Sequence, residues 1–134
     1  MTADTDPTPT ATHSSTPFRL LWVEASPKHS TSLSSACARS FLDAVTAELP
    51  IEIEHLDVWQ HDLVDFDGDA AIAKFARLFR EPLTESQTAK WDAVSTEIDR
   101  VETFDALVIS VPMWNWSIPY RLKQWLDRKS TRLN

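Results

Sequence analysis

The chain has 134 residues and a formal net charge of −7, so it is long enough for one domain with a hydrophobic core and too acidic for a general nucleic-acid or anionic-membrane binder. Its single glycine, Gly68, excludes the glycine-rich phosphate loops, and its single cysteine, Cys37, excludes an internal disulfide bond. No apolar run reaches transmembrane length, and these features together predict a cytoplasmic protein with no membrane or nucleic-acid partner.

The first part of the chain predicts a leader, a strand and a helix. Residues 1–17 are rich in threonine, serine and proline and are expected to form a disordered leader. Arg19 to Glu24 has the dense apolar centre of a strand, and Ser30 to Ser32 supply capping hydroxyls for a helix that Pro50 ends. The apolar residues of this helix recur at three- and four-residue intervals: Leu33, Ala36, Cys37, Phe41, Ala44, Val45 and Leu49.

The middle of the chain predicts an edge strand and two helices. Apolar and polar residues alternate from Ile51 to Val58, a pattern typical of a strand near the edge of a sheet. Helical spacing returns from Ala70 to Phe79. Thr84 and Gln87 then have the spacing of a capping box, which predicts the start of a longer helix.

The last third predicts a strand, a loop between prolines and a helix. Ala106 to Val111 is a short apolar run rich in β-branched residues, as in a strand covered on both faces. The loop runs from Pro112 to Pro119, and a helix with an apolar stripe follows it. Strands that alternate with helices predict an α/β protein with a doubly wound parallel sheet.

Open sheets of this kind bind ligands at the carboxyl ends of their strands. After the first strand, Ser26, Ser30, Thr31 and Ser32 lie near the start of a helix, where hydroxyls and free amides could bind a phosphate. The alternative is an ordinary serine-rich helix cap.

The loop after the third strand contains Met113, Trp114, Asn115 and Trp116, more flat and polarisable groups than a turn requires. They favour a ligand that is flat and polar. The alternative is that the tryptophans pack the loop against the sheet or against a second subunit.

Other candidate sites have weaker patterns. Residues 65–69 resemble a calcium loop, but its glycine comes too early and Ala76 occupies the position of the closing glutamate. His55 and His61 match no zinc spacing, and His29 is expected to be exposed to solvent. The sequence therefore predicts no metal ligands and no catalytic side chains.

Several of these motifs resemble one known family. Four segments are similar to segments of the FMN-dependent NADH azoreductases, also described as FMN-dependent NADH:quinone oxidoreductases. They are Ser26-Pro27-Lys28 with Ser30-Thr31-Ser32, Phe66-Asp67-Gly68-Asp69-Ala70, Pro82-Leu83-Thr84 and above all Val111-Pro112-Met113-Trp114-Asn115-Trp116-Ser117-Ile118-Pro119. The resemblance implies a flavodoxin-like fold with strand order 2-1-3-4-5, of which the chain would contain the first three strands.

The resemblance also implies a function. Ser26 and the serines and threonine at 30–32 would hold the FMN phosphate, while residues 113–116 would line the isoalloxazine ring. NADH or NADPH would reduce the flavin, which would reduce a quinone or azo compound in a ping-pong reaction, and the enzyme would be a homodimer. The alternatives are a non-enzymatic flavodoxin-like electron carrier and an inactive fragment.

The resemblance covers residues 18–127, which we expect to form the N-terminal portion of an FMN-binding domain. Members of the family continue for roughly two more strands and helices. Residues 128–134 do not resemble the family and are similar to a translated cloning or adapter sequence. We therefore expect a chain truncated at its C-terminus.

Overall fold

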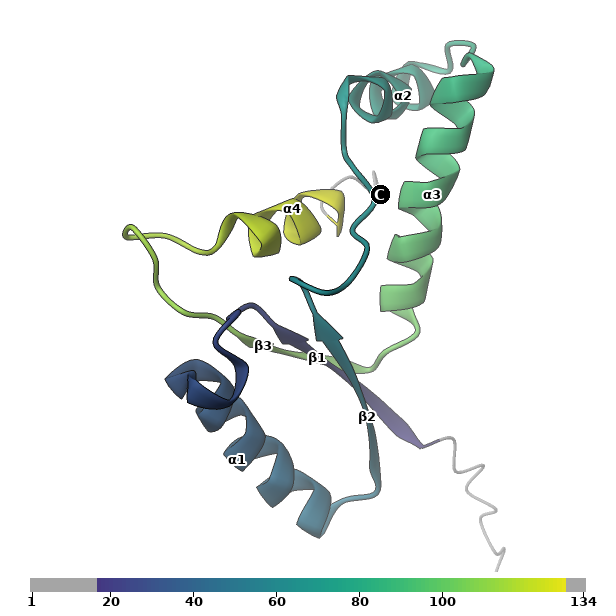
Figure 1. The fold of residues 1–134 in the computed structure, drawn as a ribbon. Coiled ribbons are helices and arrows are strands. Elements are labelled where there is room, and N and C mark those ends of the chain that lie inside the picture. The colour runs from purple at the N-terminus through teal and green to yellow at the C-terminus, as the bar shows by residue number, and fades with distance from the viewer. Residues whose placement is uncertain (1–16, 130–134) are drawn as a thin grey trace, which may run out of the picture.

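A computed structural model describes residues 17–129, so most of the predicted leader and the last five residues of the predicted tail lie outside the described residues. Three strands alternate with helices, as the sequence predicts (Figure 1). The elements in chain order are β1 (Phe18–Glu24), the 3-10 turn η1 (His29–Thr31), α1 (Leu33–Glu48), β2 (Ile51–Asp57), α2 (Gly68–Phe79), α3 (Glu85–Glu102), β3 (Ala106–Ser110) and α4 (Tyr120–Lys129).

The three strands form one parallel sheet in the order β2-β1-β3. In the centre of the sheet, Leu20 of β1 is paired with Ile53 of β2 and with Ala106 of β3. The predicted parallel sheet and the order of its first three strands are therefore confirmed. Because all strands run the same way, their carboxyl ends meet at one edge, where the connecting loops gather.

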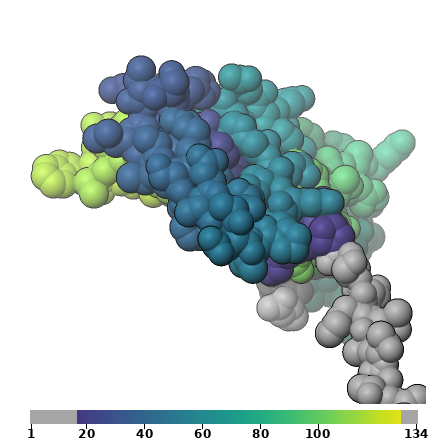
Figure 2. All heavy atoms as spheres, turned by 90° about the horizontal axis from the view of Figure 1, so that it is seen from below, coloured from purple at the N-terminus to yellow at the C-terminus, as the bar shows by residue number. Residues whose placement is uncertain are grey.

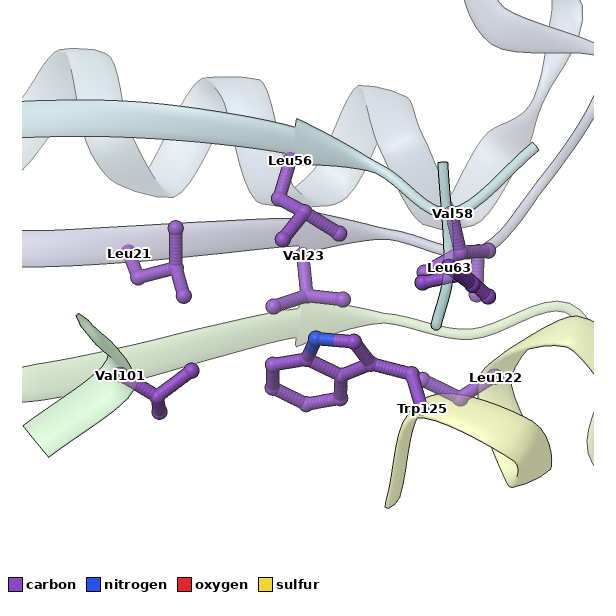
Figure 3. Packing of buried hydrophobic residues seen from close by; sticks show 9 residues of the cluster. Leu21, Val23, Leu56, Val58, Leu63, Val101, Leu122 and Trp125 are labelled. Atoms are coloured by element: carbon purple, nitrogen blue, oxygen red, sulfur yellow. The ribbon is translucent and has the colours of Figure 1, made fainter. Parts of the chain in front are cut away.

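Helices cover both faces of the sheet. On one face, Ala38 and Leu42 of α1 pack against Leu20 and Trp22 of β1. On the other face, α3 and α4 cover a larger cluster, in which Trp125 lies beneath the strands (Figure 3). The members of that cluster are Leu21, Val23, Ala25, Leu56, Val58, Leu63, Val101, Leu122 and Trp125. Residues 20–24 of β1 are all buried, and because successive side chains of a strand point to opposite faces, they build a core on each side of the sheet.

Helices α2 and α3 form a hairpin that extends away from the sheet (Figure 1). Asp67 caps α2 by accepting a hydrogen bond from the Ala70 amide, and Arg80 ends that helix in the left-handed region at φ 58°. The predicted capping box of α3 is present, because Thr84 and Gln87 each accept from the other's amide.

Helix α1 turns a different side to the sheet from the one that its apolar residues predict. Its buried residues are Ser35, Ala38 and Leu42, whereas Leu33 is 85% and Phe41 52% exposed. Cys37, predicted on the apolar side, is also exposed. The small side chains of Ser35 and Ala38 let the helix approach the strands closely, so the bulkier apolar stripe is left outside.

Two features near the end of the chain also differ from expectation: the burial of β3 and the end of α4. The predicted burial of the third strand on both faces is wrong, because Ile109 is 36% exposed, residues 106–108 are half-buried and only Ser110 is buried. In the described residues, β3 pairs only with β1, so its other edge is not covered by a strand. Helix α4 continues to Lys129, two residues into the segment predicted as a foreign tail.

Candidate functional site

The loops after β1 and β3 begin side by side at the carboxyl edge of the sheet. The Ala25 amide donates a hydrogen bond to the Ser110 carbonyl at 3.0 Å, and the Trp22 indole nitrogen donates to the Ser110 hydroxyl, also at 3.0 Å. The predicted phosphate-binding and aromatic segments therefore start from adjacent points. This is the edge at which parallel α/β sheets bind ligands.

The loop after β1 is held by hydrogen bonds of its own. The Ser26 hydroxyl, 1% exposed as a residue, accepts from the Lys28 amide, and the Lys28 carbonyl accepts from both the amide and the hydroxyl of Thr31. The Ser32 amide then donates to the His29 carbonyl at 3.1 Å. These bonds fix the path of the chain from the strand to α1.

Ser32 is the cap of α1, and its hydroxyl accepts from the Ser35 amide. The first intrahelical bond runs from the Ala36 amide to the Ser32 carbonyl. The amides of Leu33 and Ser34 precede that bond, so the helix itself offers them no acceptor, and they are free to bind an anion. The Ser34 hydroxyl lies 3.0 Å from that of Ser32, at the same helix end.

The four residues predicted to bind a phosphate thus differ in burial. Ser26 and Ser32 are buried beside the start of α1, whereas Ser30 and Thr31 are exposed on η1. Sequence reasoning did not include Leu33 and Ser34, the residues that contribute the first-turn amides. The spacing of Ser32 and Ser35, a hydroxyl three residues before the amide that it caps, would have identified the helix start.

The loop after β3 closes in a tight two-residue turn. Trp114 and Ser117 exchange two backbone hydrogen bonds of 2.9 and 2.8 Å, and the residues between them, Asn115 and Trp116, have φ of 47° and 62°. Two consecutive positive φ values are typical of a type I′ turn, for which Asn-Gly is the preferred sequence. A tryptophan therefore occupies the position where glycine is favoured.

The aromatic residues of this loop point in different directions. Trp114 is half-buried, with its ring centroid 5.9 Å from that of Trp59, and Trp59 makes an edge contact of 5.5 Å with Tyr120. Trp116 and Met113 are 96% and 77% exposed. The loop projects from the body of the protein as the lime-coloured atoms at the left of Figure 2. One tryptophan thus anchors the loop and the other lies open to a ligand or partner.

Trp59 connects the two loops, and sequence reasoning did not single it out. Its ring contacts Trp114 of the loop after β3, and its indole nitrogen donates to the carbonyl of Ala25 at 3.0 Å. The backbone amide of Trp59 in turn donates to the Asp57 carboxylate at 2.8 Å. No strand or helix periodicity includes this residue, so only the fold reveals its position.

A cavity of about 480 Å³ lies between the acidic loop before α2 and helix α4. Its lining residues are Asp65, Phe66, Asp67, Tyr120, Lys123, Gln124 and Asp127. Lys123 is paired with Asp127 at 2.7 Å, and Lys90 with Asp67 at 2.9 Å. This acidic lining disfavours a phosphate, which leaves the start of α1 as the better anion site.

Two of the histidines lie beside carboxylates in the structure. His61 lies 3.6 Å from Glu97 of α3, while the Nε2 atom of His55 in β2 donates to the carboxylate of the buried Glu24 at 3.0 Å. Burial raises the pKa of the Glu24 carboxyl, but the nearby Ser35 hydroxyl, the charge of His55 and the polar contacts with the His29 and His55 rings outweigh that effect and hold the pKa below its ordinary value. Glu24 is therefore an ionised carboxylate at neutral pH.

Comparison with known proteins agrees with this geometry. The profile of the family described as "Flavodoxin-like fold" matches residues 19–132. The chain is 38% identical over 116 residues to FMN-dependent NADH:quinone oxidoreductase 2 of Burkholderia lata, covering 86% of this chain and 56% of that protein. It is 40% identical over 110 residues to the FMN-dependent NADH:quinone oxidoreductase of Ruegeria pomeroyi, covering 81% and 54%.

Solved structures show the same fold. An azoreductase from Bacillus anthracis strain Sterne superposes with a TM-score of 0.72 at 21% identity, covering 84% of this chain and 55% of that one. An FMN-dependent NADH-azoreductase from Bacillus anthracis strain Ames Ancestor, in complex with FMN, superposes with a TM-score of 0.68 at 21% identity, covering 83% and 54%. The chain thus spans about half the length of the relatives that it matches. None of the helices in its described part combines the length and hydropathy needed to cross a bilayer.

Proposed function

This chain belongs to the flavodoxin-like fold family, and we propose that the protein is an FMN-dependent NAD(P)H oxidoreductase that reduces quinones, azo compounds or both. The observation that carries the proposal is the pairing of two loops at one sheet edge, one with free helix amides and one with exposed flat side chains. The names of the relatives support the same activity, since they are FMN-dependent NADH:quinone oxidoreductases.

The residues of this chain fit the two ends of FMN. The amides of Leu33 and Ser34, with the hydroxyls of Ser26 and Ser32, would bind the phosphate at the positive end of α1. Ser30 and Thr31, implied by the family resemblance, lie on the adjoining turn and remain predicted contacts. Trp114, Asn115 and the exposed Met113 and Trp116 would line the ring.

Bound FMN would supply the redox chemistry, taking a hydride from NADH or NADPH and passing it to the acceptor in a ping-pong cycle. The protein residues then have to bind and orient the ring and exclude water. Trp59 has the positioning role, because it holds Trp114 by ring contact and the loop after β1 by its hydrogen bond to Ala25. No side chain is needed as a catalytic acid or base in this proposal.

We also propose that the protein is cytoplasmic and forms a homodimer. Exposed apolar side chains on α1, Leu33 and Phe41, together with Trp116, are the kind of residues that a second subunit would cover. Sedimentation of the chain with and without FMN would measure the oligomeric state. A monomer at all concentrations would contradict the homodimer.

Titration of the 134-residue chain with FMN and with riboflavin, followed by flavin fluorescence, tests the proposed function. We expect FMN to bind more tightly than riboflavin, since only FMN has the phosphate that α1 would bind. NADH oxidation in the presence of a quinone, with parallel double-reciprocal plots, would be the signature of the ping-pong reaction. Equal affinity for both flavins, or no binding of either, would contradict the proposal, and flavin binding without NADH oxidation would favour the electron carrier.

A further inference from the structure

Two neighbouring segments, β1 and η1, and a third that lies more distant in sequence, β2, bring four titratable side chains together beside the loop after β1. Glu24 comes from the end of β1, His29 from η1, and His55 and Asp57 from β2. Parallel pairing of β1 and β2 sets Glu24 opposite Asp57 in the register. The cluster therefore arises from the sheet topology, and no spacing within one segment of the sequence could reveal it.

The distances in the cluster suit a small cation. The His29 Nδ1 atom lies 3.6 Å from the Glu24 Oε2 atom and 3.5 Å from the Asp57 Oδ2 atom, and the three groups offer ligand atoms within 4.8 Å of one another. Ligands at about 2.0–2.2 Å from a tetrahedral zinc ion are separated by about 3.3–3.6 Å. An ion between these three atoms would thus need little movement of the ligands.

We propose that Glu24, His29 and Asp57 form a binding site for a divalent transition-metal ion of the zinc class, in which a water molecule or His55 completes the coordination. Imidazole with two carboxylates is a donor set that such ions accept. The ion would link β1, η1 and β2. The proposal does not depend on flavin binding.

The charge and burial of Glu24 supply an independent reason for a cation. The Glu24 side chain is only 3% exposed, and its Oε1 atom accepts no hydrogen bond from the described residues. Its nearest fixed positive charge is Arg39, whose Nη1 atom lies 3.8 Å away on an exposed side chain. Burying an ionised carboxylate is costly unless positive charge compensates it. Apart from the two histidines, the site holds two carboxylates and one arginine, so its fixed positive charge does not balance its carboxylates.

The other charged group that lines this region is already engaged. Arg100 lines the same cavity of about 470 Å³ as Glu24, His29 and Asp57. It forms ion pairs with Glu54 and Glu97. Arg100 is therefore occupied elsewhere, and the cavity gives an ion and its water ligand a path from solvent.

Supporting contacts hold the proposed ligands in place. His55 lies 3.0 Å from Glu24 through its Nε2 atom and stacks on Trp22 with ring centroids 4.3 Å apart. The Asp57 Oδ1 atom accepts a hydrogen bond from the Trp59 amide, so the Oδ2 atom is the one that faces His29. Outer contacts of this kind orient metal ligands and raise affinity.

Equilibrium dialysis of the 134-residue chain against Zn²⁺ tests the site, with His29→Asn as the main variant. Asparagine tolerates the left-handed backbone of His29, which has φ 44°, but is too short to replace the imidazole. His61→Asn is the matched control, since His61 lines the same cavity but pairs with Glu97. We expect one equivalent of Zn²⁺ on the wild type and on the control, and affinity at least about tenfold weaker for His29→Asn.

A second variant and a second probe make the outcome decisive. Asp57→Asn keeps the acceptor for the Trp59 amide but removes the charge, so it should also weaken Zn²⁺ binding while the circular dichroism spectrum remains that of the wild type. Co²⁺ should give the visible absorption of a tetrahedral nitrogen and oxygen site. Equal Zn²⁺ affinity in His29→Asn and His61→Asn, or no Zn²⁺ binding by the wild type, would overturn the proposal.

Discussion

The two loops at the carboxyl edge of the sheet are built by opposite means. Residues 25–32 after β1 form a polar loop that is held by short-range hydrogen bonds, and its serines at 26 and 32 are buried. Residues 111–119 after β3 form an apolar loop whose tight turn leaves Trp116 almost fully exposed. The polar loop makes its hydrogen bonds among the described residues, whereas the apolar loop presents two side chains, Met113 and Trp116, that the described residues leave exposed.

The difference matches the two kinds of ligand group that the loops would bind, a small anion and a flat ring. A site for a small anion needs amides at fixed positions, and internal hydrogen bonds can supply that alone. A site for a flat ring needs apolar surface that stays uncovered until the ring arrives. The strained Asn115-Trp116 pair fits that second need, because a glycine at position 116 would suit the turn better but offer no surface.

Removing the side chain that joins the two loops should have the largest effect. Trp59→Ala would lose the ring contacts with Trp114 and Tyr120 and the hydrogen bond to Ala25, and we expect the free energy of unfolding to fall by about 3 kcal/mol. Urea denaturation, monitored by circular dichroism, measures this free energy of unfolding. Trp59→Phe keeps an aromatic ring and should lose about 1–2 kcal/mol. If both variants matched the wild type, the two loops would be independent.

Deleting one amide at the start of α1 should affect FMN and spare riboflavin. Leu33→Pro removes the first-turn N–H at a helix position that tolerates proline, and the extended backbone of Ser32 suits a following proline. We expect FMN affinity to fall about tenfold or more, because a hydrogen bond to a charged group contributes about 1.5–3 kcal/mol to binding.

Leu33→Ala is the matched control, because it keeps the amide and removes the same exposed side chain. Fluorescence titrations of both variants with both flavins give the comparison. A similar loss of riboflavin affinity in Leu33→Pro would show a general disturbance of the loop, and unchanged FMN affinity would place the phosphate elsewhere.

Relieving the turn after β3 should stabilise the chain and weaken ring binding. Trp116→Gly places glycine where the backbone has φ 62°, and we expect the thermal midpoint to rise with a gain of about 0.5–1 kcal/mol. FMN and riboflavin should lose affinity equally, since both contain the ring. A destabilised variant would show that Trp116 packs against the protein, contrary to its 96% exposure.

Lowering the pH should perturb the loop after β1 more than the loop after β3. The pKa of Glu24 lies below its ordinary value of about 4.5, so its contribution to stability is complete above that pH and is lost as pH falls through the lower, folded-state pKa. Residues 111–119 contain no titratable side chain. Between pH of about 6 and 3.5, amide NMR signals of Ser32 should shift more than those of Trp116.

Glu24→Gln provides the check on that titration, because it removes the ionised group and keeps the size of the side chain. Its thermal midpoint should depend less on pH in the acid range than that of the wild type. An unchanged acid dependence would assign the effect to other carboxylates.

Much of the fold followed from local patterns in the sequence. The apolar run of β1, the alternation of β2 and the capping box at Thr84 each predict an element that the structure contains. These signals depend on neighbouring residues, which is why one sequence suffices to find them. The side of α1 that faces the sheet did not follow, because two candidate stripes lie next to each other and close packing selected the one with smaller residues.

The candidate site was predictable only in part for a related reason. The two loops could be located because each follows a strand. Trp59 and the cluster around Glu24 could not, because their partners are brought together by pairing between strands that are distant in sequence. The exact start of α1, and with it the free amides of Leu33 and Ser34, required the backbone conformation of Ser32.

The position of β1 in the centre of the sheet has a consequence for folding kinetics. Of the three described strands β1 is synthesised first, but its second neighbour, β3, comes much later: Arg19 of β1 and Asp105, the residue before β3, are hydrogen-bonded and 86 positions apart. A two-stranded sheet is only marginally stable, and closing so long a loop is slow. A nascent chain therefore exposes the apolar flank of β1 until β3 docks, and substitutions in β3 should slow folding more than those in β2.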